Sequence, residues 1–422
     1  MEFKPTKDFA IEMDQNDPLK KYRDHFYFPK HTDGKEAVYL CGNSLGLQPK
    51  SAKKHIEAVL DDWRYLGVKG HFEGDHPFAT YHEGLGEQMA KIVGAKKKEV
   101  VAMNSLTVNL HFMLVSFYKP SKHRFKILIE KNAFPSDQYA VKSQIEFHGF
   151  DPKEALIEME ARDGEDLIRT EDILELLKNQ GEQISLVMLG GLNYYTGQAF
   201  EMAKITETGH AMGCMVGFDL AHGAGNLDLH LHDWNVDFAV WCTYKYMNSG
   251  PGGIAGCFVH EKHVTRTDLP RFAGWWGHDK ATRFLMDDTF VPIQGAEGWQ
   301  MSNETVLSMA ALKASLEIFD EVGMKALIAK SRILTAYLEY LVGALDTDRI
   351  QIISPKQPEL RGAQLSLRVL NSNKSLFEKI SDKGVIADWR EPDVIRIAPA
   401  PLYNNYSDVY EFVQILKESL NL

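Results

Sequence analysis

Short apolar runs alternate with stretches of helical periodicity through the middle of the chain. Runs rich in β-branched and aromatic residues are typical of buried strands, and apolar positions three or four residues apart are typical of amphipathic helices. The alternation predicts an α/β fold of βαβ units, with a mostly parallel sheet sandwiched by helices. The predicted strands are Lys126–Glu130, Ile184–Leu189, Met215–Asp219, Phe238–Thr243 and Ile254–His260, and the predicted helices are Leu106–Phe117, Asp137–Ser143, Thr170–Lys178 and Glu201–Met212.

The pattern changes after Gly298. Ser302–Leu345 has the periodicity of one long helix or two consecutive helices, and shorter elements follow it. This pattern of helices and short strands predicts a smaller α+β domain, with which the N-terminal run Ala37–Cys41 is expected to pack. We therefore predict a large domain over 49–298 and a small domain formed by 1–48 and 299–422. The small domain's other predicted elements are the strands Gln351–Ile353, Gln364–Val369 and Val394–Ile397 and the helices Lys374–Ser381 and Ser407–Leu420.

Length and charge narrow the classes of protein that fit. At 422 residues the chain exceeds what one hydrophobic core usually supports. With 47 Lys and Arg against 58 Asp and Glu, the net charge is −11, so no excess of cations is available to bind a nucleic-acid backbone. Residues 1–20 show no secretory pattern, and the apolar runs are far shorter than the roughly 20 residues that span a bilayer. We expect a cytoplasmic protein without nucleic-acid or membrane partners.

The cysteines are expected to be buried free thiols. Cys41, Cys214, Cys242 and Cys257 lie far apart and form no CxxC pair, and three of them sit in apolar stretches. This favours small core residues over disulfides or metal ligands. No metal is therefore expected.

Two strand ends carry candidate chemistry. The strand Met215–Asp219 ends in a carboxylate, which suits the N-cap of a following helix or a partner for a buried, protonated pyridine nitrogen. Lys245 follows a run from Phe238 onward that holds no other charge. Burial there would lower the pKa of its ammonium group and free the amine for Schiff-base formation, whereas most lysines are simply solvated.

Two helix starts are candidates for phosphate binding. Asn104–Thr107 opens a helix at Ser105, which could act only as an N-cap, but free N–H groups beside a hydroxyl also suit a phosphate. Ala133–Asp137 opens another helix with a proline, which alone is weak evidence. A phosphate cradle followed by Asp219 and then Lys245, in this fold, matches pyridoxal phosphate.

The chain resembles the fold-type I, class V pyridoxal-phosphate enzymes, and more closely the kynureninase family, from about Tyr39 to Tyr406. The resemblance implies fold type I, with a mostly parallel sheet of the seven-stranded type and a smaller α+β domain. Its long strings are 40-LCGNSLGLQP-49, 194-YYTGQ-198, 217-GFDLAH-222, 244-YKY-246, 274-GWWGH-278 and 395-IRIAP-399.

The resemblance also implies roles for single residues. Lys245 would hold the cofactor covalently and move the Cα proton, Tyr244 would relay a proton, and Asp219 would pair with the pyridine nitrogen. Trp275 and Asn303 would reach the cofactor from a second subunit of a homodimer, although Trp275-Trp276 by itself reads as aromatic core. The other cofactor contacts would be His222, Leu106, Thr107, Phe134, Pro135, Ser136 and Asp137.

Substrate contacts follow from the same resemblance. Arg396 would bind the α-carboxylate, although by pattern alone it reads as a surface arginine on an edge strand. Ser44, His71 and Asn303 would lie near the aryl end of the substrate, with His76 as an alternative to His71. Gly190 departs from the family, because relatives often have Ser there, and a hydroxyl contact to the cofactor is expected to be lost.

The implied activity is hydrolysis of the Cβ–Cγ bond of L-kynurenine or 3-hydroxykynurenine, giving L-alanine and anthranilate or 3-hydroxyanthranilate, in tryptophan degradation or NAD precursor synthesis. A cysteine desulfurase would need a mobile nucleophilic cysteine well after Lys245, and Cys257 is the last cysteine. An aminotransferase would use the same Asp219, Lys245 and Arg396. A dinucleotide-dependent oxidoreductase would need a GxGxxG string, and none follows the first strand. The sequence is also compatible with a dimeric scaffold protein that has no catalytic activity.

Overall fold

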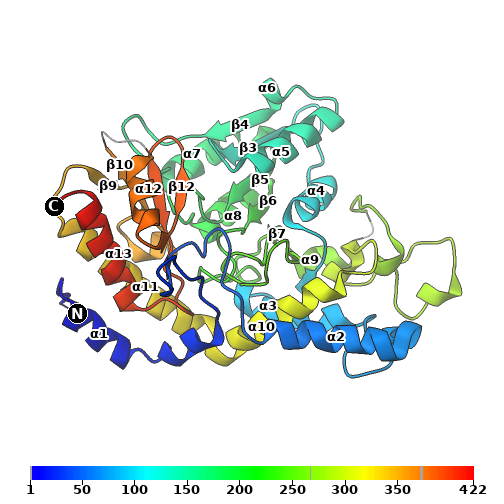
Figure 1. Cartoon of the computed structure of the whole chain (residues 1–422). Coiled ribbons are helices and arrows are strands. Elements are labelled where there is room, and N and C mark those ends of the chain that lie inside the picture. The colour runs from blue at the N-terminus through cyan, green and yellow to red at the C-terminus, as the bar shows by residue number, and fades with distance from the viewer. Residues whose placement is uncertain (1, 267, 371–373) are drawn as a thin grey trace.

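A seven-stranded sheet crosses the centre of the molecule (Figure 1). The structure, a computed structural model, describes residues 2–266, 268–370 and 374–422. In spatial order the strands of the sheet are β2 (Val100–Ala102), β8 (Gly256–Val259), β7 (Phe238–Trp241), β6 (Met215–Asp219), β5 (Ile184–Gly190), β3 (Lys126–Glu130) and β4 (Leu156–Met159).

The sheet is mostly parallel, as predicted, with a mixed edge. Strands β7, β6, β5, β3 and β4 pair in parallel, whereas β8 is antiparallel to both β7 and β2. The run Ile254–His260 is thus a strand, but it does not continue the βαβ series, because residues 242–255 turn back as a loop without a crossover helix. The sequence pattern missed β2 and β4, which are only three and four residues long.

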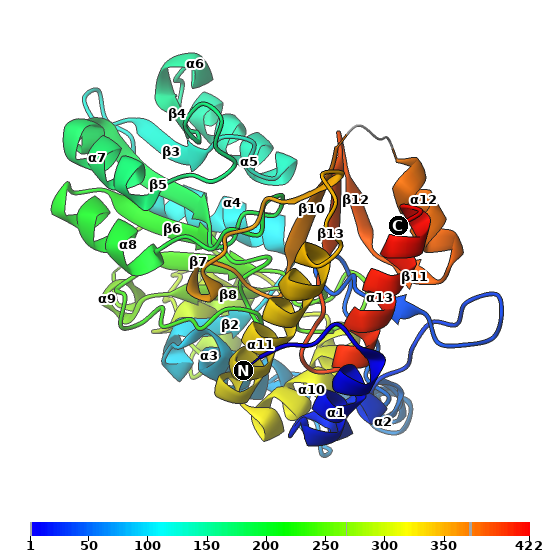
Figure 2. The same ribbon diagram turned by 90° about the vertical axis from the view of Figure 1, so that its left-hand side faces the viewer.

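Alternate side chains of the parallel strands enter two cores. Ile127 and Ile129 of β3 pack with residues of α4 and α5, whereas Leu128 between them joins the opposite core with α7 and α8. This is the period-2 pattern of a strand buried on both faces, and Figure 2 shows the two helix layers. Their bounds are α4 (Leu106–Phe117), α5 (Pro135–Phe147), α7 (Thr170–Gln180) and α8 (Met202–Ala211).

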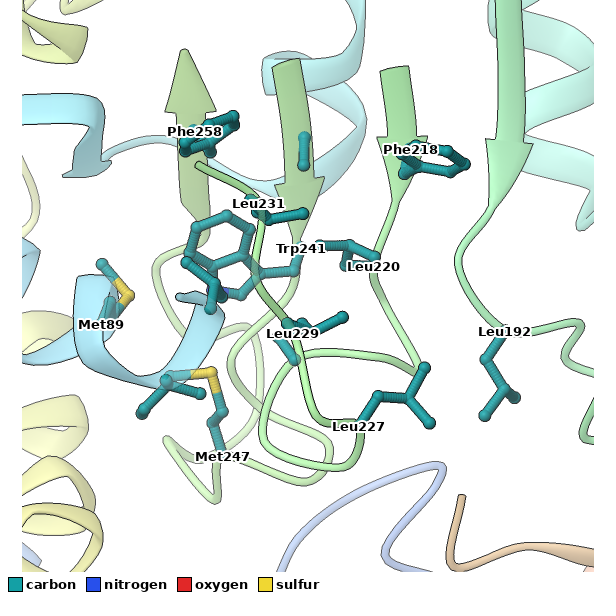
Figure 3. Close-up of a cluster of buried hydrophobic side chains, with 14 of the residues drawn as sticks. Met89, Leu192, Phe218, Leu220, Leu227, Leu229, Leu231, Trp241, Met247 and Phe258 are labelled. Atoms are coloured by element: carbon teal, nitrogen blue, oxygen red, sulfur yellow. The ribbon is translucent and has the colours of Figure 1, made fainter. Parts of the chain in front are cut away.

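Trp241 fixes the end of β7. Its side chain is fully buried, and Figure 3 shows it among Leu229, Leu231 and Met247. The residue opposite it on β8 is Gly256, where a Cβ would lie 2.1 Å from the indole ring. Only glycine leaves room for the indole here. The packing therefore sets the point from which the loop carrying Lys245 departs.

A second, antiparallel sheet lies beside the first and has the order β12 (Asp388–Arg390), β13 (Val394–Ile397), β10 (Leu365–Val369) and β9 (Ile350–Ile352). Leu365, Leu367, Ile395 and Ile397 share a core with helices α11, α12 and α13. Those helices are α11 (Met324–Gly343), α12 (Ser375–Asp382) and α13 (Tyr406–Ser419).

The N-terminal segment packs with this second sheet region, as predicted. Strand β1 (Val38–Tyr39) pairs in parallel with β11 (Val385–Ile386), and α1 (Lys7–Asn16) packs on α13. Figure 2 shows both contacts at the same side of the molecule. The domain boundaries at 48/49 and 298/299 stay a prediction.

The helical stretch predicted over Ser302–Leu345 is two helices. α10 (Val306–Val322) ends at Gly323, whose φ of 76° breaks the helix before α11 begins. α10 packs on α2 (Ala52–Leu66) and α3 (Tyr81–Val93) (Figure 1). The remaining short helices are α6 (Pro152–Ala155), α9 (Glu261–Val264) and the 3-10 turns Lys20–His25, Gly67–His71, Lys97–Glu99, Gly181–Gln183, Trp275–Gly277, Arg283–Leu285, Ala296–Trp299 and Pro358–Leu360.

Within the part of the chain that the structure describes, no helix combines the length and the apolar character needed to cross a bilayer.

Candidate active site

The carboxyl ends of neighbouring parallel strands meet at one cavity. Glu130 ends β3, Gly190 ends β5, Asp219 ends β6, and Lys245 lies in the loop after β7. Ligands of such sheets bind beyond this edge. The cavity is lined by Leu106, Thr107, Glu130, Phe134, Ser136, Asp137, Gly190, Leu192, Tyr194, Asp219, Ala221, His222, Tyr244 and Lys245.

Lys245 faces a histidine inside the cavity. Its Nζ lies 3.0 Å from Nε2 of His222, and its ammonium group lies 5.9 Å from the centre of the Phe134 ring. Burial, with the charges of Lys245 and Arg396 added, holds the pKa of His222 well below its usual value. A neutral imidazole therefore accepts the hydrogen bond, and no second positive charge lies against the lysine.

Three carboxyl groups line the same cavity, and all three are buried. Burial raises the pKa of Glu130 to about 7 and raises the pKa values of Asp137 and Asp219 as well. Asp137 and Asp219 share a hydrogen bond that favours the proton on Asp137, while the N–H of Ala221, 2.6 Å from Asp219 Oδ1, and the Lys245 charge stabilise Asp219 as the anion. Asp219 is thus the carboxylate suited to face a cationic ring nitrogen.

The cavity also offers hydrogen-bond donors. Ser105 occupies the N-cap position of α4, but its side chain makes no capping hydrogen bond, so the N-cap explanation of this serine fails. The hydroxyls of Thr107 and Ser136 lie 2.8 Å apart and both line the cavity. An uncapped helix start with two hydroxyls beside it suits a phosphate group.

Arg396 lies beside the cavity and is buried. It stands on β13, an inner strand of the second sheet, and only 1% of the residue is exposed, so the surface-arginine interpretation is wrong. Its Nη1 donates to the backbone oxygen of Tyr194 at 2.9 Å, and Tyr194 lines the cavity. The tertiary fold therefore brings residue 396 to the site built by the first sheet.

Several residues expected from the sequence do not line the cavity of one chain. Pro135 begins α5 beside it, and Ser44 and His71 are partly buried but do not belong to its lining. His71 lies in an apolar surface groove with Trp63, Phe78 and Leu307.

The two residues expected to act across a subunit boundary are exposed. Asn303 is at the surface, and 44% of Trp275 is accessible, whereas its neighbour Trp276 is buried as core. The aromatic-core interpretation therefore holds for Trp276 and fails for Trp275.

The sequence reasoning missed some lining residues. Glu130 accepts the N–H of Gly190 at 3.1 Å, and it could have been found, because it is the last residue of a predicted strand at the ligand-binding edge. A Cβ at Gly190 would lie 2.8 Å from the Glu130 carboxyl group. Tyr194 and Ala221 were recognised only within motif strings, and Leu192 carried no signal.

The residues present fit pyridoxal phosphate. Asp137 Oδ1 and His222 Nδ1 are buried polar atoms without a hydrogen-bond partner, and both residues line the cavity. Buried polar atoms are rarely left unpaired, so such orphans indicate a polar ligand. The amine of Lys245 suits the aldehyde of the cofactor, and the carboxylate of Asp219 suits its pyridine nitrogen. The start of α4, with its hydrogen-bond donors, suits the phosphate.

The cysteines are buried and free, as predicted. Burial strongly raises the pKa of the Cys257 thiol, which lies within β8. A thiol of this kind is a poor nucleophile. The structure therefore offers no carrier for persulfide chemistry among the four cysteines.

Comparison with known sequences identifies related proteins along the full length of the chain. A family model described as the kynureninase C-terminal domain matches residues 327–416. A kynureninase of Koribacter versatilis is 57% identical over 419 residues, covering 99% of each chain. Kynureninases of Myxococcus xanthus and Nematostella vectensis are 57% and 49% identical, covering 98% and 97% of this chain and 97% and 93% of their own.

Solved structures with the same fold are more distant in sequence. A cysteine desulfurase of Thermococcus onnurineus superposes with a TM-score of 0.75 at 16% identity, covering 92% of this chain and 95% of its own. A variant of the lyase C-DES, with glycine covalently linked to its PLP cofactor, gives a TM-score of 0.74 at 16% identity, with 90% and 96% covered. At this identity the likeness establishes the fold.

Proposed function

The chain belongs to the kynureninase family, and we propose that the cavity around Lys245 is its active site. The protein is a pyridoxal-phosphate-dependent hydrolase that cleaves the Cβ–Cγ bond of L-kynurenine, giving anthranilate and L-alanine. The observation that carries the placement is the convergence of Lys245, Asp219 and the open start of α4 on one cavity. Activity on 3-hydroxykynurenine, and the roles in tryptophan degradation and NAD precursor supply, stay predictions, as does the cytoplasmic location.

Lys245, Asp219 and the start of α4 would hold the cofactor at three points. Lys245 supplies the amine for the covalent bond, Asp219 the anion for the pyridine nitrogen, and Thr107 with Ser136 the hydroxyls for the phosphate. Phe134 and His222 lie next to Lys245 and offer flat faces to the ring. When bound, pyridoxal phosphate supplies an electron sink for the charge that develops on the substrate.

Lys245 and Tyr244 would move the protons. The amine of Lys245 removes the proton from the substrate Cα, and neutral His222 orients that amine through the 3.0 Å contact. Burial raises the pKa of Tyr244, so its hydroxyl keeps its proton at neutral pH and can pass one to Cβ when the carbon–carbon bond breaks. A water molecule adds to the γ-carbonyl carbon before this bond breaks, so that the carbon leaves as the carboxyl group of anthranilate.

Arg396 would bind the substrate α-carboxylate, since a planar, buried guanidinium is the strongest donor for that group. Ser44, His71 and Asn303 are proposed to contact the aryl end. Which of His71 and His76 faces the substrate stays open, because both are partly buried and neither lines the cavity.

We also propose a homodimer with a shared active site. Large apolar side chains are exposed together in an apolar patch, which we define as Trp63, Val68, Phe72, Trp275, Phe284, Leu285 and Met286. The Phe284 ring lies 5.9 Å from Phe72 and 5.4 Å from Trp275, so the patch joins two distant segments. An exposed patch of this kind marks an interface, and a second subunit covering it would carry Trp275 and Asn303 toward its partner's cofactor.

The cofactor placement is tested by spectroscopy. The purified protein should absorb visible light through its covalently bound cofactor, and borohydride should bleach this band and fix the cofactor on the peptide containing Lys245. Lys245→Ala should lose the band that borohydride traps and almost all release of fluorescent anthranilate. A Lys245→Ala enzyme that cleaves kynurenine at the wild-type rate would contradict the proposal.

A half-reaction separates hydrolysis from amino-group transfer. After one turnover with kynurenine, hydrolysis returns the original absorbance and releases the aryl amine. An aminotransferase would leave its cofactor in the amine form, with the visible band lost.

A further inference from the structure

Asp388 holds two arginines beside the cavity. Its Oδ2 accepts from Nη2 of Arg396 at 2.6 Å and from Nη2 of Arg390 at 3.0 Å. Its other oxygen, Oδ1, lies 2.9 Å from Nε of Arg390. Asp388 therefore makes one hydrogen bond to each arginine, and its Oδ1 adds an ion-pair contact to Arg390 that lacks hydrogen-bond geometry.

Strand register produces this arrangement. Asp388 and Arg390 are two residues apart on β12 and lie on one face, and Asp388 stands directly opposite Arg396 on β13. The exposed fractions of the side chains are 1% for Arg396, 10% for Asp388 and 35% for Arg390. Arg396 and Asp388 thus form a buried ion pair, and Arg390, which also contacts Asp388, is partly exposed to solvent.

Both arginines lie against the active-site cavity. Each guanidinium is 5.9 Å from the ring of Tyr194, and the positive charges of both contribute to lowering the pKa of His222. Tyr194 and His222 line the cavity.

The charges of this group are suited to one incoming carboxylate. Two guanidinium groups and one carboxylate sum to +1, so one added carboxylate makes the group neutral. Asp388 already occupies Nη2 of Arg396, whereas Nε of Arg396 is buried without a partner. A carboxylate that binds Arg396 with both oxygens, through Nε and Nη2, must therefore displace Asp388 from Nη2.

We propose that Asp388 is an internal stand-in for the substrate α-carboxylate, which holds Arg396 before substrate binds and is retained by Arg390 alone afterwards. The inference rests on the proposed role of Arg396. The exchange requires the loss of one contact, from Asp388 Oδ2 to Arg396, because both contacts of Asp388 to Arg390 exist already. Asp388 and Arg390 are positioning residues, and Arg396 binds the substrate.

The test compares two ligands that differ only in the carboxylate. L-Alanine and L-alaninol are titrated into the holoenzyme, and visible absorbance gives their dissociation constants. In Arg390→Gln the remaining charges sum to zero and Asp388 has no other arginine, so L-alanine should bind about tenfold more weakly or worse. KM for L-kynurenine should rise by a similar factor with a much smaller change in kcat, and L-alaninol affinity should stay the same.

Asp388→Asn and the double variant give the decisive result. Asp388→Asn removes the competing charge, so L-alanine affinity should be unchanged or tighter. Arg390→Gln combined with Asp388→Asn restores the net charge of +1, and L-alanine affinity should return to within about threefold of wild type. Arg390→Lys, which keeps the charge, should show a smaller loss than Arg390→Gln.

Three results would overturn the proposal. Wild-type L-alanine affinity in Arg390→Gln would show that Asp388 needs no second arginine. A double variant as weak as Arg390→Gln would show that Arg390 contacts the ligand itself. Weaker L-alanine binding in Asp388→Asn would show that Asp388 only orients Arg396. Thermal unfolding of each variant identifies any that fail to fold.

The role of Arg396 is tested in the same assay. If Arg396→Lys still discriminates between L-alanine and L-alaninol as wild type does, the carboxylate role of Arg396 fails, and the inference fails with it. If Arg396→Lys loses the discrimination while the Arg390 variants keep it, the proposed function stands and only the inference fails.

Discussion

At the scale of single residues, the site depends on which carboxyl groups hold protons. Glu130, Asp137 and Asp219 lie around one cavity, and like charges so close in a buried place cannot all be ionised. The hydrogen bond from Asp137 and the charge of Lys245 leave the negative charge on Asp219. Asp137 thus acts as a neutral hydrogen-bonding group beside it, and Glu130 does so below its pKa of about 7.

Glu130 gives the cofactor-free protein a pH-dependent stability. Its pKa of about 7 in the folded protein lies above the ordinary value of 4.5, so the stabilisation is complete below about pH 4.5 and is lost as pH rises through 7. Glu130→Gln cannot ionise, so it should not lose this stability as the pH rises. We predict that its free energy of unfolding relative to wild type increases by up to about 3 kcal/mol from pH 5 to pH 8. Denaturant unfolding of both cofactor-free proteins at the two pH values measures this difference.

Glu175→Gln serves as the control for that measurement, because Glu175 is exposed on α7. The pH dependence that Glu130→Gln shows beyond this control is the part that the burial of Glu130 causes. An equal difference for Glu130→Gln at pH 5 and pH 8 would contradict the shifted pKa.

At the scale of elements, the N-terminal segment is packed against the loop of the catalytic lysine. The N–H of Gly46 donates to the backbone oxygen of Tyr244 at 2.8 Å. A Cβ at Gly46 would lie 2.3 Å from the backbone oxygen of Lys245 and 2.8 Å from Cα of Asn248. These are backbone atoms that have no room to move aside, so the segment after β1 helps to place Lys245.

Gly46→Ala should therefore displace the lysine loop. We predict a loss of about 1–3 kcal/mol in free energy of unfolding, the usual effect of overpacking, together with weaker cofactor binding. Thermal unfolding and cofactor titration measure the two effects. Gly84→Ala, at an exposed position of α3 with nothing within 4 Å of the added carbon, should be neutral or stabilising. Wild-type cofactor affinity in Gly46→Ala would disprove the coupling.

At the scale of the whole molecule, the proposed dimer follows from surface that one chain leaves uncovered. Leu285 and Met286 are 73% and 75% exposed within the apolar patch. We predict that Leu285→Glu yields monomers in light scattering and weakens cofactor binding, because burying a charge in an apolar interface is costly. Phe147→Glu, on α5 and 76% exposed outside the patch, should leave the oligomeric state unchanged.

Shared active sites permit complementation between two inactive subunits. Lys245→Ala and Asn303→Ala chains should each be nearly inactive alone, and a coexpressed mixture should regain activity, because one site of each mixed dimer has both residues intact. A mixture as inactive as its components would place Asn303 in the same subunit's site or outside any site.

Strand runs such as Met215–Asp219 and Val394–Ile397 were predictable to the residue, because period and bounding residues mark a buried strand locally. Strand direction was not, since β8 reverses through a loop whose course depends on Trp241 and Gly256 packing together. Strand β2 has only three residues, too few for a pattern, and β4 is an edge strand that is not fully buried and so shows no continuous apolar run.

The sequence by itself determined the chemistry that the protein has available. Asp219 at a strand end, Lys245 after an uncharged strand, and Thr107 at a helix start are local facts, and the family strings around them identify the reaction. Only the tertiary structure decided what surrounds them. Glu130 joins the carboxyl groups, and Asp388 bridges Arg390 and Arg396, because strand order and register bring together residues that are far apart along the chain. The patterning of a sequence encodes local geometry, whereas burial and charge balance depend on all the segments that meet at a site.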